Sequence, residues 1–541
     1  FATVTESNIW LTKTVAQVTL GVGALVITAV AVLLGTLVSL RSRPAKDNRP
    51  NRVIAAYRHR MGHGHAWALL ALALYVTLSQ SSVAMDHWKQ WLTFLHASSL
   101  GSPVPEVGWD LGYHLFRLPL LTWLSTWLRI VLLWAVGLAT AGYVANGALK
   151  LPREGRRSSK RAAMHLGIGL AVLAAVQGLH YIFVQWPNLA TGHFGTFDGA
   201  GYTQIHLIIP GLWLLAFAAF ATAAMFVRGA LSGSWRPAVI SLIVWAGLHL
   251  IVLLGLPALV NKFVVEPAEA TRQIPYITLN LDATRSAYDL NSVDQVVQVV
   301  ADGLDTQPSS DLDAELDKMP VFSEDFLISP LQVLKGTAGT RITDVDLDRY
   351  EIDGERRPVF VAARSANRSD LPEKGWVQEH LVYTHGDGVV AVPADTTSSD
   401  GRPDVDALDE MFDVDTPELY FGEKMGGWYA IVGTDRTELG GSEFDGDTAI
   451  ALDSVWRRFA LAMSVGEIEP LVSAELGTNS ELLYRRDVLE RLNYLAPFLS
   501  FDANPYPVVA DGRITWVVEG YTRSSTYPYS QYARNTNLPT A

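Results

Sequence analysis

The sequence predicts an α-helical transmembrane bundle of six spans followed by a large α+β extracytoplasmic domain. Six mostly apolar runs, each of the roughly 20 residues that a membrane helix needs, all precede residue 262. The formal charge is +12 up to Asn261 and −25 after it. From residue 262 on, apolar runs shorten and turn residues multiply. We therefore expect two domains, a bundle over 1–261 and an acidic α+β domain over 262–541.

The six apolar runs predict helices, because backbone N–H and C=O groups cannot stay unpaired in lipid. The expected partner of this half is a lipid bilayer. The spans are placed near 15–40, 66–85, 126–148, 163–184, 205–227 and 238–260.

Basic residues in the short connections indicate which way the bundle faces. Three connections on one face, 41–60, 150–161 and 228–237, carry most of the Lys and Arg residues of the first half. Cytoplasmic loops carry such an excess of basic residues. We therefore expect a multi-pass protein of the cell membrane whose second half lies outside the cytoplasm.

Two segments next to the spans carry expectations of their own. The stretch 105–125 is interrupted by Pro105 and Pro119 and is rich in Trp and Tyr, which favours an interfacial segment that does not cross. Residues 262–290 predict a linker, stiffened by Pro267 and Pro275, whose part from 278 begins a helix that docks the outer domain.

Composition excludes several classes of site. The chain contains no cysteine, which excludes disulfides, zinc–thiolate centres and thiol nucleophiles. The acidic second half would repel the phosphates of nucleic acid, so no nucleic-acid partner is expected.

Ionisable residues inside apolar helices are candidate functional groups. His180 and His206 lie near the outer ends of the fourth and fifth spans, which a short loop joins, and His249 lies at about mid-depth of the sixth. These histidines are the candidate haem, metal or proton site of the bundle. The alternative is that each makes an ordinary polar contact between helices.

The second half shows short elements of both kinds. We expect helices near 291–303, 448–464 and 480–496, and strands near 358–363, 376–384, 388–393, 427–433 and 513–520. Asp511-Gly512 before the last strand is the pair typical of a tight hairpin turn.

An alternating acidic stretch is the candidate metal site. Asp344, Asp346 and Asp348 alternate with apolar residues, which places three carboxylates on one face of a strand, about 7 Å apart. Calcium is the candidate cofactor, although Arg349 stands where an EF-hand loop needs glycine. The alternative is a solvated face whose acids are neutralised by arginine.

Other catalytic signals are weak. His380 and His385 could share a metal only if the predicted strand breaks between them, since residues five apart on a strand point to opposite faces. Phosphate-loop, zinc-protease and nucleophile-elbow motifs are absent from the sequence.

Several ordered stretches resemble the uncharacterised protein family 0182, large bacterial multi-pass membrane proteins. They are "VGWDLGYHLFRLPLL" (107–121), "DGAGYTQIHLIIP" (198–210), "VEPAEATRQIPYITLNLDATRSAYDL" (265–290), "DVDLDRYEIDGERRPVFVAAR" (344–364), "HLVYTHGDGVVAVPA" (380–394) and "FDANPYPVVADGRITWVVEGYTRSSTYPYS" (501–530). The resemblance implies a bundle of about seven helices with a large extracytoplasmic region, one more helix before this chain starts and further sequence after its end. It brings no established activity.

Three classes of function stay open. The preferred one is a non-enzymatic membrane protein whose outer domain binds a protein partner or envelope component or scaffolds a membrane complex. Transport or lipid handling through the bundle is the alternative, although the span cores carry almost no charged residues. An extracytoplasmic metal-dependent enzyme is the third.

Overall fold

The structure, a computed structural model, describes residues 6–42, 64–149, 159–194, 197–294, 319–352, 354–408, 412, 414–446 and 448–531. The chain forms two compact units. Unit 1 comprises Phe1–Val297 and Ser524–Asn537, and unit 2 comprises Gln298–Arg523 and Leu538–Ala541. Unit 1 thus extends past the expected boundary at residue 261 and includes a segment from near the end of the sequence.

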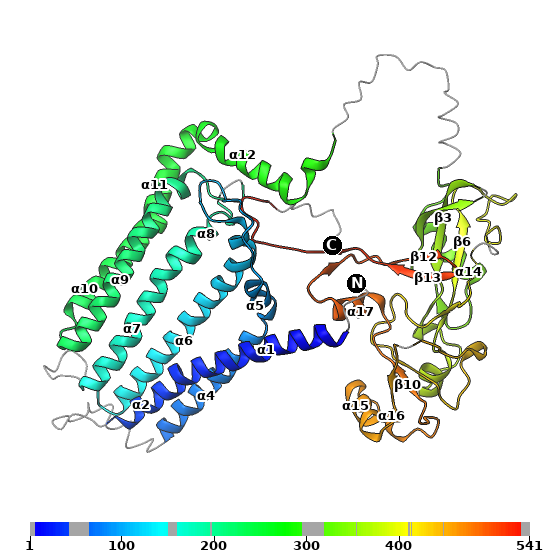
Figure 1. The fold of residues 1–541 in the computed structure, drawn as a ribbon, viewed down its shortest axis with the longest axis horizontal. Coiled ribbons are helices and arrows are strands. Elements are labelled where there is room, and N and C mark those ends of the chain that lie inside the picture. Colours follow the sequence, from blue (N-terminus) through cyan, green and yellow to red (C-terminus); the bar gives the residue numbers. More distant parts are fainter. Residues whose placement is uncertain are drawn as a thin grey trace, which may run out of the picture. The chain divides into compact units, whose positions relative to one another are not determined.

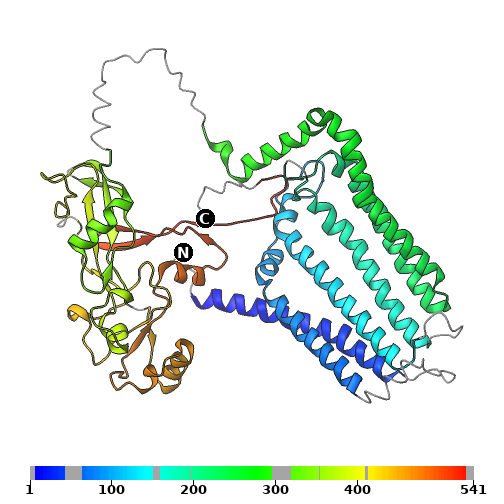
Figure 2. The same cartoon turned by 180° about the vertical axis from the view of Figure 1, so that it is seen from behind.

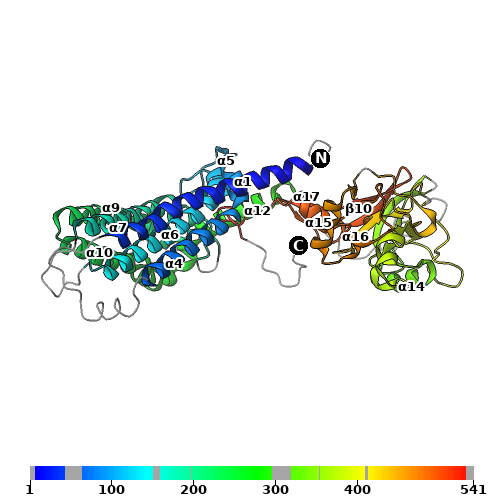
Figure 3. The ribbon, with the colours of Figure 1, turned by 90° about the horizontal axis from the view of Figure 1, so that it is seen from below.

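The described part of unit 1 contains six helices that are long and apolar enough to cross a membrane, as predicted. The candidate spans are Ile9–Arg41, Gly64–Met85, Tyr113–Ala145, Lys160–Asn188, Gln204–Ser232 and Arg236–Ala287. Helices α6, α7, α9 and α10 follow one another as packed neighbours (Figures 1 and 3).

Most of these helices join α-helical and π-helical stretches. The first combines α1 (Glu6–Thr28), η1 (Ala29–Leu34) and α2 (Gly35–Arg41), and the second is α4 (Gly64–Met85), followed by the short α5 (Trp88–Leu95). The third combines η2 (Tyr113–Arg117) and α6 (Leu118–Ala145). The fourth combines α7 (Lys160–His180), η4 (Tyr181–Gln185) and α8 (Trp186–Asn188), and the fifth combines η5 (Gln204–Ile208) and α9 (Ile209–Ser232).

The third helix begins at Tyr113, thirteen residues before the expected start near 126. Residues 113–125 are therefore helical and continuous with the third helix, and their expected place at the membrane interface stays a prediction. Pro119 does not interrupt the helix, because it lies just after the π-helical turn η2, whose wider backbone accommodates the missing N–H.

The sixth helix continues far beyond the expected end near 260. It consists of α10 (Arg236–Leu250), η6 (Ile251–Gly255), α11 (Leu256–Val260), η7 (Asn261–Val265), η8 (Glu266–Ala268) and α12 (Glu269–Ala287), and η9 (Leu290–Ser292) follows it. Pro267 lies in the first turn of the 3₁₀ segment and Pro275 lies inside α12. The expected linker is thus largely helical, and the π and 3₁₀ turns next to Pro267 accommodate its missing N–H group.

Unit 2 contains small antiparallel sheets with helices around them. Strands β2 (Asp346–Ile352), β3 (Glu355–Ala363) and β6 (Val389–Pro393) form one sheet, and β8 (Ala430–Val432), β10 (Glu481–Leu483) and β9 (Ile450–Ala451) form another. Pairs are formed by β1 (Thr340–Arg341) with β4 (Ser365–Ala366), by β5 (Gly386–Asp387) with β7 (Glu418–Leu419), by β11 (Ser500–Phe501) with β14 (Gly520–Tyr521), and by β12 (Tyr506–Ala510) with β13 (Arg513–Val517).

The helices of unit 2 are short. They are α14 (Glu324–Lys335), α15 (Val455–Val465), α16 (Glu469–Val472) and α17 (Val488–Leu495), with single turns η10 (Arg368–Asp370), η11 (Gln378–Val382) and η12 (Leu439–Gly441). Leu327 and Leu331 of α14 are fully buried against Phe360 and Val392 of the β2–β3–β6 sheet.

Several expectations for unit 2 are confirmed. Strands form over parts of 358–363, 388–393, 427–433 and 513–520. The helices expected at 448–464 and 480–496 begin only at Val455 and Val488, and the expectation is wrong for 450–451 and 481–483, which are strands β9 and β10. Asp511 and Gly512 both have positive φ, 51° and 70°, as a tight hairpin turn of the expected type requires. The strand expected at 376–384 is wrong, because 378–382 forms a π-helical turn. Most of the helix expected at 291–303 lies outside the described residues, and Leu290–Ser292 is a 3₁₀ turn.

Candidate functional site

Four segments far apart in the sequence meet at one end of unit 1. We call them together the bundle-end junction: residues 104–109, 189–194 with 197–202, 272–286 and 527–531. Their apolar side chains share one core, which includes Val104, Val107, Ala190, Ala200 and Tyr529. Each segment overlaps or adjoins a stretch by which the sequence resembles its family. The junction is therefore a place where distant segments of unit 1 pack around one core.

Tyr529 holds the returning chain in this junction. Its side chain is 1% exposed, and its backbone N–H donates to the carbonyl oxygen of Ala190 at 2.7 Å. The amide Nδ2 of Asn280 in α12 donates to the Tyr529 carbonyl oxygen at 2.7 Å. Figure 2 shows this C-terminal segment, in red, reaching the loops next to α8. The segment is thus bound through its side chain and its backbone together.

Gly199 makes room for the tyrosine ring. Its φ of 112° is a conformation that side chains rarely allow, and a Cβ there would lie 2.3 Å from Cδ1 of Tyr529. The same Asn280 amide also donates to the carbonyl oxygen of Asp198 at 2.8 Å. One asparagine side chain therefore links the loop before the fifth span to the returning segment.

The Tyr529 hydroxyl is buried without a hydrogen-bond partner among the described residues. Burial raises the pKa of this phenol, and the Glu106 carboxylate raises it further. The Arg272 guanidinium lies over the Tyr202 ring, 4.8 Å from its centroid. The junction is therefore tight and aromatic.

The candidate histidines of the bundle each bind a different hydroxyl group. Nδ1 of His180 lies 3.0 Å from Oγ of Ser125, Nε2 of His206 lies 3.3 Å from the Tyr276 hydroxyl, and Nδ1 of His249 lies 2.8 Å from the Tyr181 hydroxyl. No contact described for the chain joins His180 to His206. These pairings match the ordinary polar contacts considered as the alternative.

His114 is a buried histidine that sequence reasoning missed. Its side chain is fully buried, and neither ring nitrogen has a hydrogen-bond partner among the described residues. It lies in the π-helical turn η2 at the start of the third span. Only its place in an apolar segment could have drawn attention to it.

The acidic stretch of unit 2 forms a strand only in part. Asp346 and Asp348 lie in β2 on its half-buried face, as the alternation predicted. Asp344 precedes the strand and accepts a hydrogen bond from the Val345 N–H at 2.9 Å. Nη2 of Arg357 pairs with Oδ1 of Asp395 at 2.6 Å.

Glu423, which the sequence did not indicate, adds to this acidic cluster. Its Oε2 accepts a hydrogen bond from Oγ1 of Thr343 at 3.1 Å, next to Asp344. Burial raises the pKa of Glu423 to about 7, and Asp344 and Asp346 raise it as well. Burial and then Asp344 raise the pKa of Asp346 to about 7. The Glu423 and Asp346 carboxyl groups, 77 residues apart in the sequence, are therefore close enough for the charge of one to affect the pKa of the other.

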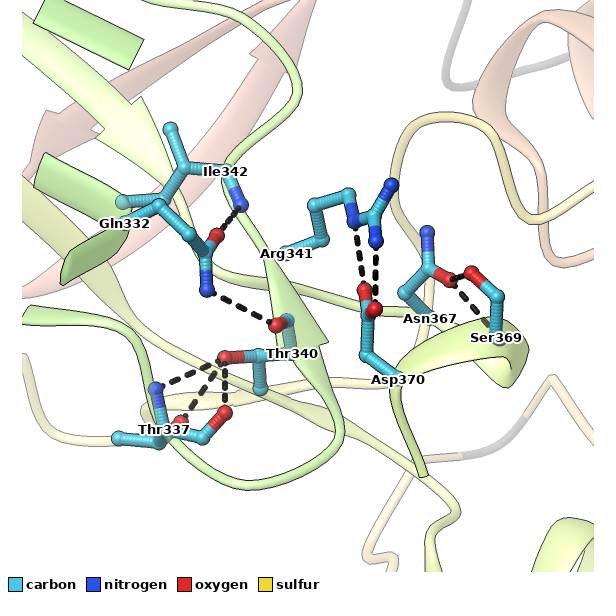
Figure 4. Close-up of polar contacts among 8 residues, drawn as sticks. All are labelled: Gln332, Thr337, Thr340, Arg341, Ile342, Asn367, Ser369 and Asp370. Atoms are coloured by element: carbon cyan, nitrogen blue, oxygen red, sulfur yellow. Dashed lines mark hydrogen bonds and ion pairs between the residues drawn. The ribbon is translucent and has the colours of Figure 1, made fainter. Parts of the chain in front are cut away.

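The residues before this cluster are held by side-chain bonds between neighbouring elements (Figure 4). The Gln332 amide of α14 accepts from the Ile342 N–H at 2.7 Å and donates to the Thr340 carbonyl oxygen at 3.3 Å. The Arg341 guanidinium donates two hydrogen bonds to the Asp370 carboxylate. These bonds set the direction in which the chain enters Asp344.

The described residues contain no group of three or more His, Asp or Glu side chains placed to hold one metal ion. The calcium site at Asp344, Asp346 and Asp348 stays a prediction and does not enter the function proposed below. His380 and His385 bind different carbonyl oxygens, since Nδ1 of His380 lies 2.8 Å from that of Tyr429 and Nε2 of His385 lies 3.1 Å from that of Leu439.

A second polar network surrounds Arg486, which is fully buried. Its Nε donates to the Tyr420 carbonyl oxygen at 2.8 Å and its Nη2 to that of Thr384. The Tyr420 hydroxyl donates to Oε2 of Glu438 at 3.1 Å. Burial lowers the pKa of Arg486 to about 9. The network joins three distant segments and encloses a charge, which is typical of a structural role.

The largest exposed side chains of unit 2 include those of α15 and α16. Trp456 is 79% exposed and Met463 is 70% exposed, and Phe459 lies between them on the same side of the helix. Leu461, on the opposite side, is 5% exposed in the core. We call the exposed set the α15–α16 face: Val455, Trp456, Phe459, Met463, Ile468 and Val472.

Comparison with known proteins agrees with the sequence resemblance. The model of the uncharacterised protein family (UPF0182) matches residues 1–540. A UPF0182 protein of Frankia alni is 30% identical over 92% of this chain and 51% of its own length. A UPF0182 protein of Salinispora tropica is 30% identical over 97% of this chain and 56% of its own length.

A UPF0182 protein of Trichlorobacter lovleyi is 31% identical over 82% of this chain and 51% of its own length. The chain therefore spans about half the length of these relatives. No solved structure matches the chain. With a family model that matches almost every residue, the chain belongs to the uncharacterised protein family UPF0182.

Proposed function

We propose that this chain is a non-enzymatic membrane protein whose bundle holds an α+β domain at the membrane surface, and that the domain binds a polypeptide partner. The α15–α16 face carries this proposal. A tryptophan and a methionine more than two-thirds exposed, on one side of one helix, cost free energy in water. Such a cost is recovered when another apolar surface covers the face.

The bundle-end junction supports the holding role. The chain leaves unit 1 after α12 and returns to it before Tyr529, so unit 2 is connected to the bundle at both of its ends. Two connections restrict a domain more than one does, because each limits the volume that the domain can sample.

The composition of the face favours a polypeptide as the partner, because aromatic residues and methionine are enriched in protein–protein interfaces. Charge does not favour an anionic partner, since Arg457 of α15 already pairs with Asp453 at 3.3 Å.

The basic connections 41–60, 150–161 and 228–237 support an orientation with unit 2 outside the cytoplasm of the cell membrane. Because the chain has no cysteine, a single cysteine in place of Tyr383 reports this orientation. Labelling by a membrane-impermeant maleimide in intact cells is expected. If the cysteine were labelled only after the cells are lysed, unit 2 would lie in the cytoplasm and the proposed orientation would be wrong.

The partner is tested by photocrosslinking. p-Benzoyl-phenylalanine replaces Trp456, Phe459 or Met463 in the full chain in its native membranes. The control position is Arg402, whose side chain is 77% exposed. We expect one and the same polypeptide adduct from the three face positions and none from Arg402. Lipid adducts, adducts between copies of the chain, or no adduct would each overturn the proposal.

The crosslinked polypeptide is then purified and titrated against the full chain in nanodiscs. Met463→Asp is expected to raise Kd by roughly tenfold or more, because an ionised carboxylate replaces a buried apolar side chain worth about 1.5–3 kcal/mol. Arg402→Asp is the matched control and should leave Kd unchanged.

A further inference from the structure

Helix α5 carries an apolar stripe directly after the second span. Trp88, Trp91, Leu92 and Leu95 have the spacing that places side chains on one side of a helix, and Lys89 and Thr93 lie on the other side. The helix packs on α1, η2 and α6, yet none of its residues is fully buried. Leu95 is 55% exposed. The neighbouring helices thus cover the stripe only in part.

The length of the second span places α5 at a particular depth. Helix α4 has 22 residues, and at about 1.5 Å per residue it is only slightly longer than the roughly 30 Å hydrocarbon core. If Gly64–Met85 crosses the bilayer, Met85 lies at the edge of the hydrocarbon. Only Asp86 and His87 separate Met85 from α5. The start of α5 therefore lies at the same edge.

Contacts of α5 and the preceding turn with two other spans indicate the same depth in the bilayer. The His87 ring stacks on Trp123 of the third span with 4.4 Å between centroids. Nζ of Lys13 in α1 lies 5.5 Å from the centroid of the Trp88 ring. Trp and Lys are residues that collect where hydrocarbon meets headgroups. From Trp123 to the end of α6 at Ala145 the helix again has about the length that a bilayer requires.

We propose that α5 lies in the headgroup region of the bilayer and that lipid covers the part of its apolar stripe that α1, η2 and α6 leave open. Lipid is the occupant because α5 follows the second span after only two residues, and that span itself exposes Leu74, Tyr75 and Leu78, as a helix surrounded by lipid does. An interfacial helix of this kind has aromatic and aliphatic residues on one side and Lys on the other.

This assignment moves the interfacial role from 105–125 to Trp88–Leu95. It also places residues 113–122 of the third helix beyond the hydrocarbon, because Trp123 marks the edge. The bundle-end junction, which packs around that end of unit 1, would then stand in water. The inference does not depend on the partner of the α15–α16 face.

The test uses the full chain with single cysteines carrying a nitroxide spin label. The protein is reconstituted in vesicles of phosphatidylcholine and phosphatidylglycerol, and relaxation is measured with oxygen, which enters lipid, and with a neutral nickel chelate, which stays in water. The positions are Leu95→Cys on the stripe and Thr93→Cys as the matched control on the polar side. Leu74→Cys, 49% exposed on α4 before substitution, is the reference inside the hydrocarbon.

We expect the nickel chelate to reach the label at position 95 about fivefold less than the label at 93, at a depth shallower than that at 74. Equal nickel accessibility at 93 and 95 would mean that α5 lies in water and would overturn the proposal. A label at 95 as deep as that at 74 would also overturn it, since the helix would then be inside the hydrocarbon.

Discussion

Replacing Tyr529 by alanine should release the returning segment from the bundle-end junction. The ring is 1% exposed and fills the space that Gly199 leaves. The backbone bonds to Ala190 and Asn280 do not involve the side chain and stay available in the variant. The stability that the segment loses in this variant therefore comes from the packing of one aromatic ring.

Its magnitude follows from the cost of deleting a buried aromatic side chain. Large aromatic residues replaced by alanine in cores lose about 3–5 kcal/mol. Because every 1.4 kcal/mol is about a factor of ten, the open state of this segment should become a few hundred-fold more populated. Tyr529→Phe should stay within about 1 kcal/mol of the parent, since the hydroxyl has no partner whose bond would be lost.

Cysteine labelling measures this opening. Ala190→Cys, at a position that is fully buried beside Tyr529, supplies the only thiol in the chain. In nanodiscs, the maleimide reaction at this thiol should accelerate a few hundred-fold with Tyr529→Ala and hardly at all with Tyr529→Phe, provided that closing is faster than labelling. In a separate variant, Leu212→Cys places the single thiol in α9 at a position that is 1% exposed, and this thiol should stay protected.

Two results would refute this reasoning. If Tyr529→Ala labels at the parent rate, the ring does not hold the segment. If the thiol at Leu212 becomes reactive as well, the substitution unfolds the bundle and the effect is not local.

The remaining predictions concern unit 2. The pKa of Glu423 is raised from 4.5 to about 7, and that of Asp346 is raised to about 7 as well. The folded state therefore binds protons that the unfolded state has released, so stability should fall as pH rises from about 4.5 to 7 and stay level above it. Glu423→Gln should reduce the fall in the free energy of unfolding by about 2 kcal/mol, a value that allows for solvent screening. The unfolding midpoints of unit 2 between pH 5 and 8 measure this change. If the variant and the parent declined in parallel, the carboxyl group would not be the cause. Arg486→Met should destabilise unit 2 by roughly 3 kcal/mol, because it leaves the buried Glu438 carboxylate without its compensating charge. Denaturant unfolding measures this loss, and a change below about 1 kcal/mol would show that the buried charge contributes little.

Short-range rules were enough where a single segment determines its own structure. The six span candidates were found because lipid leaves an apolar segment no alternative to a helix. The Asp511-Gly512 turn was found because two adjacent positive φ angles favour those residue types. The same rules failed at Pro267, where adjoining 3₁₀ and π turns let the helix continue, and at Pro275, which lies inside α12.

The candidate site depended on contacts that no local pattern shows. Asp346 and Asp348 lie on one face of β2 as predicted, yet Glu423 approaches them from a segment 77 residues away. Arg357, which lies opposite a residue of β2 in the sheet, forms an ion pair with Asp395, a residue 38 positions away in the sequence. Which acid meets which base is decided by strand pairing, and strand pairing joins residues of any separation.

The sequence alone determined the division into an apolar, basic first half and an acidic second half. It also predicted the six helices, the main hairpin and the family resemblance. Each of these depends on residue types within one span or turn, because the free energy of placing a segment in lipid or bending it sharply is a local quantity. Only the tertiary structure decided that residues 524–531 return to the bundle, that one tyrosine holds them there and that the α15–α16 face is left uncovered. Those outcomes depend on which distant surfaces fit together, and fit is a property of the folded chain as a whole.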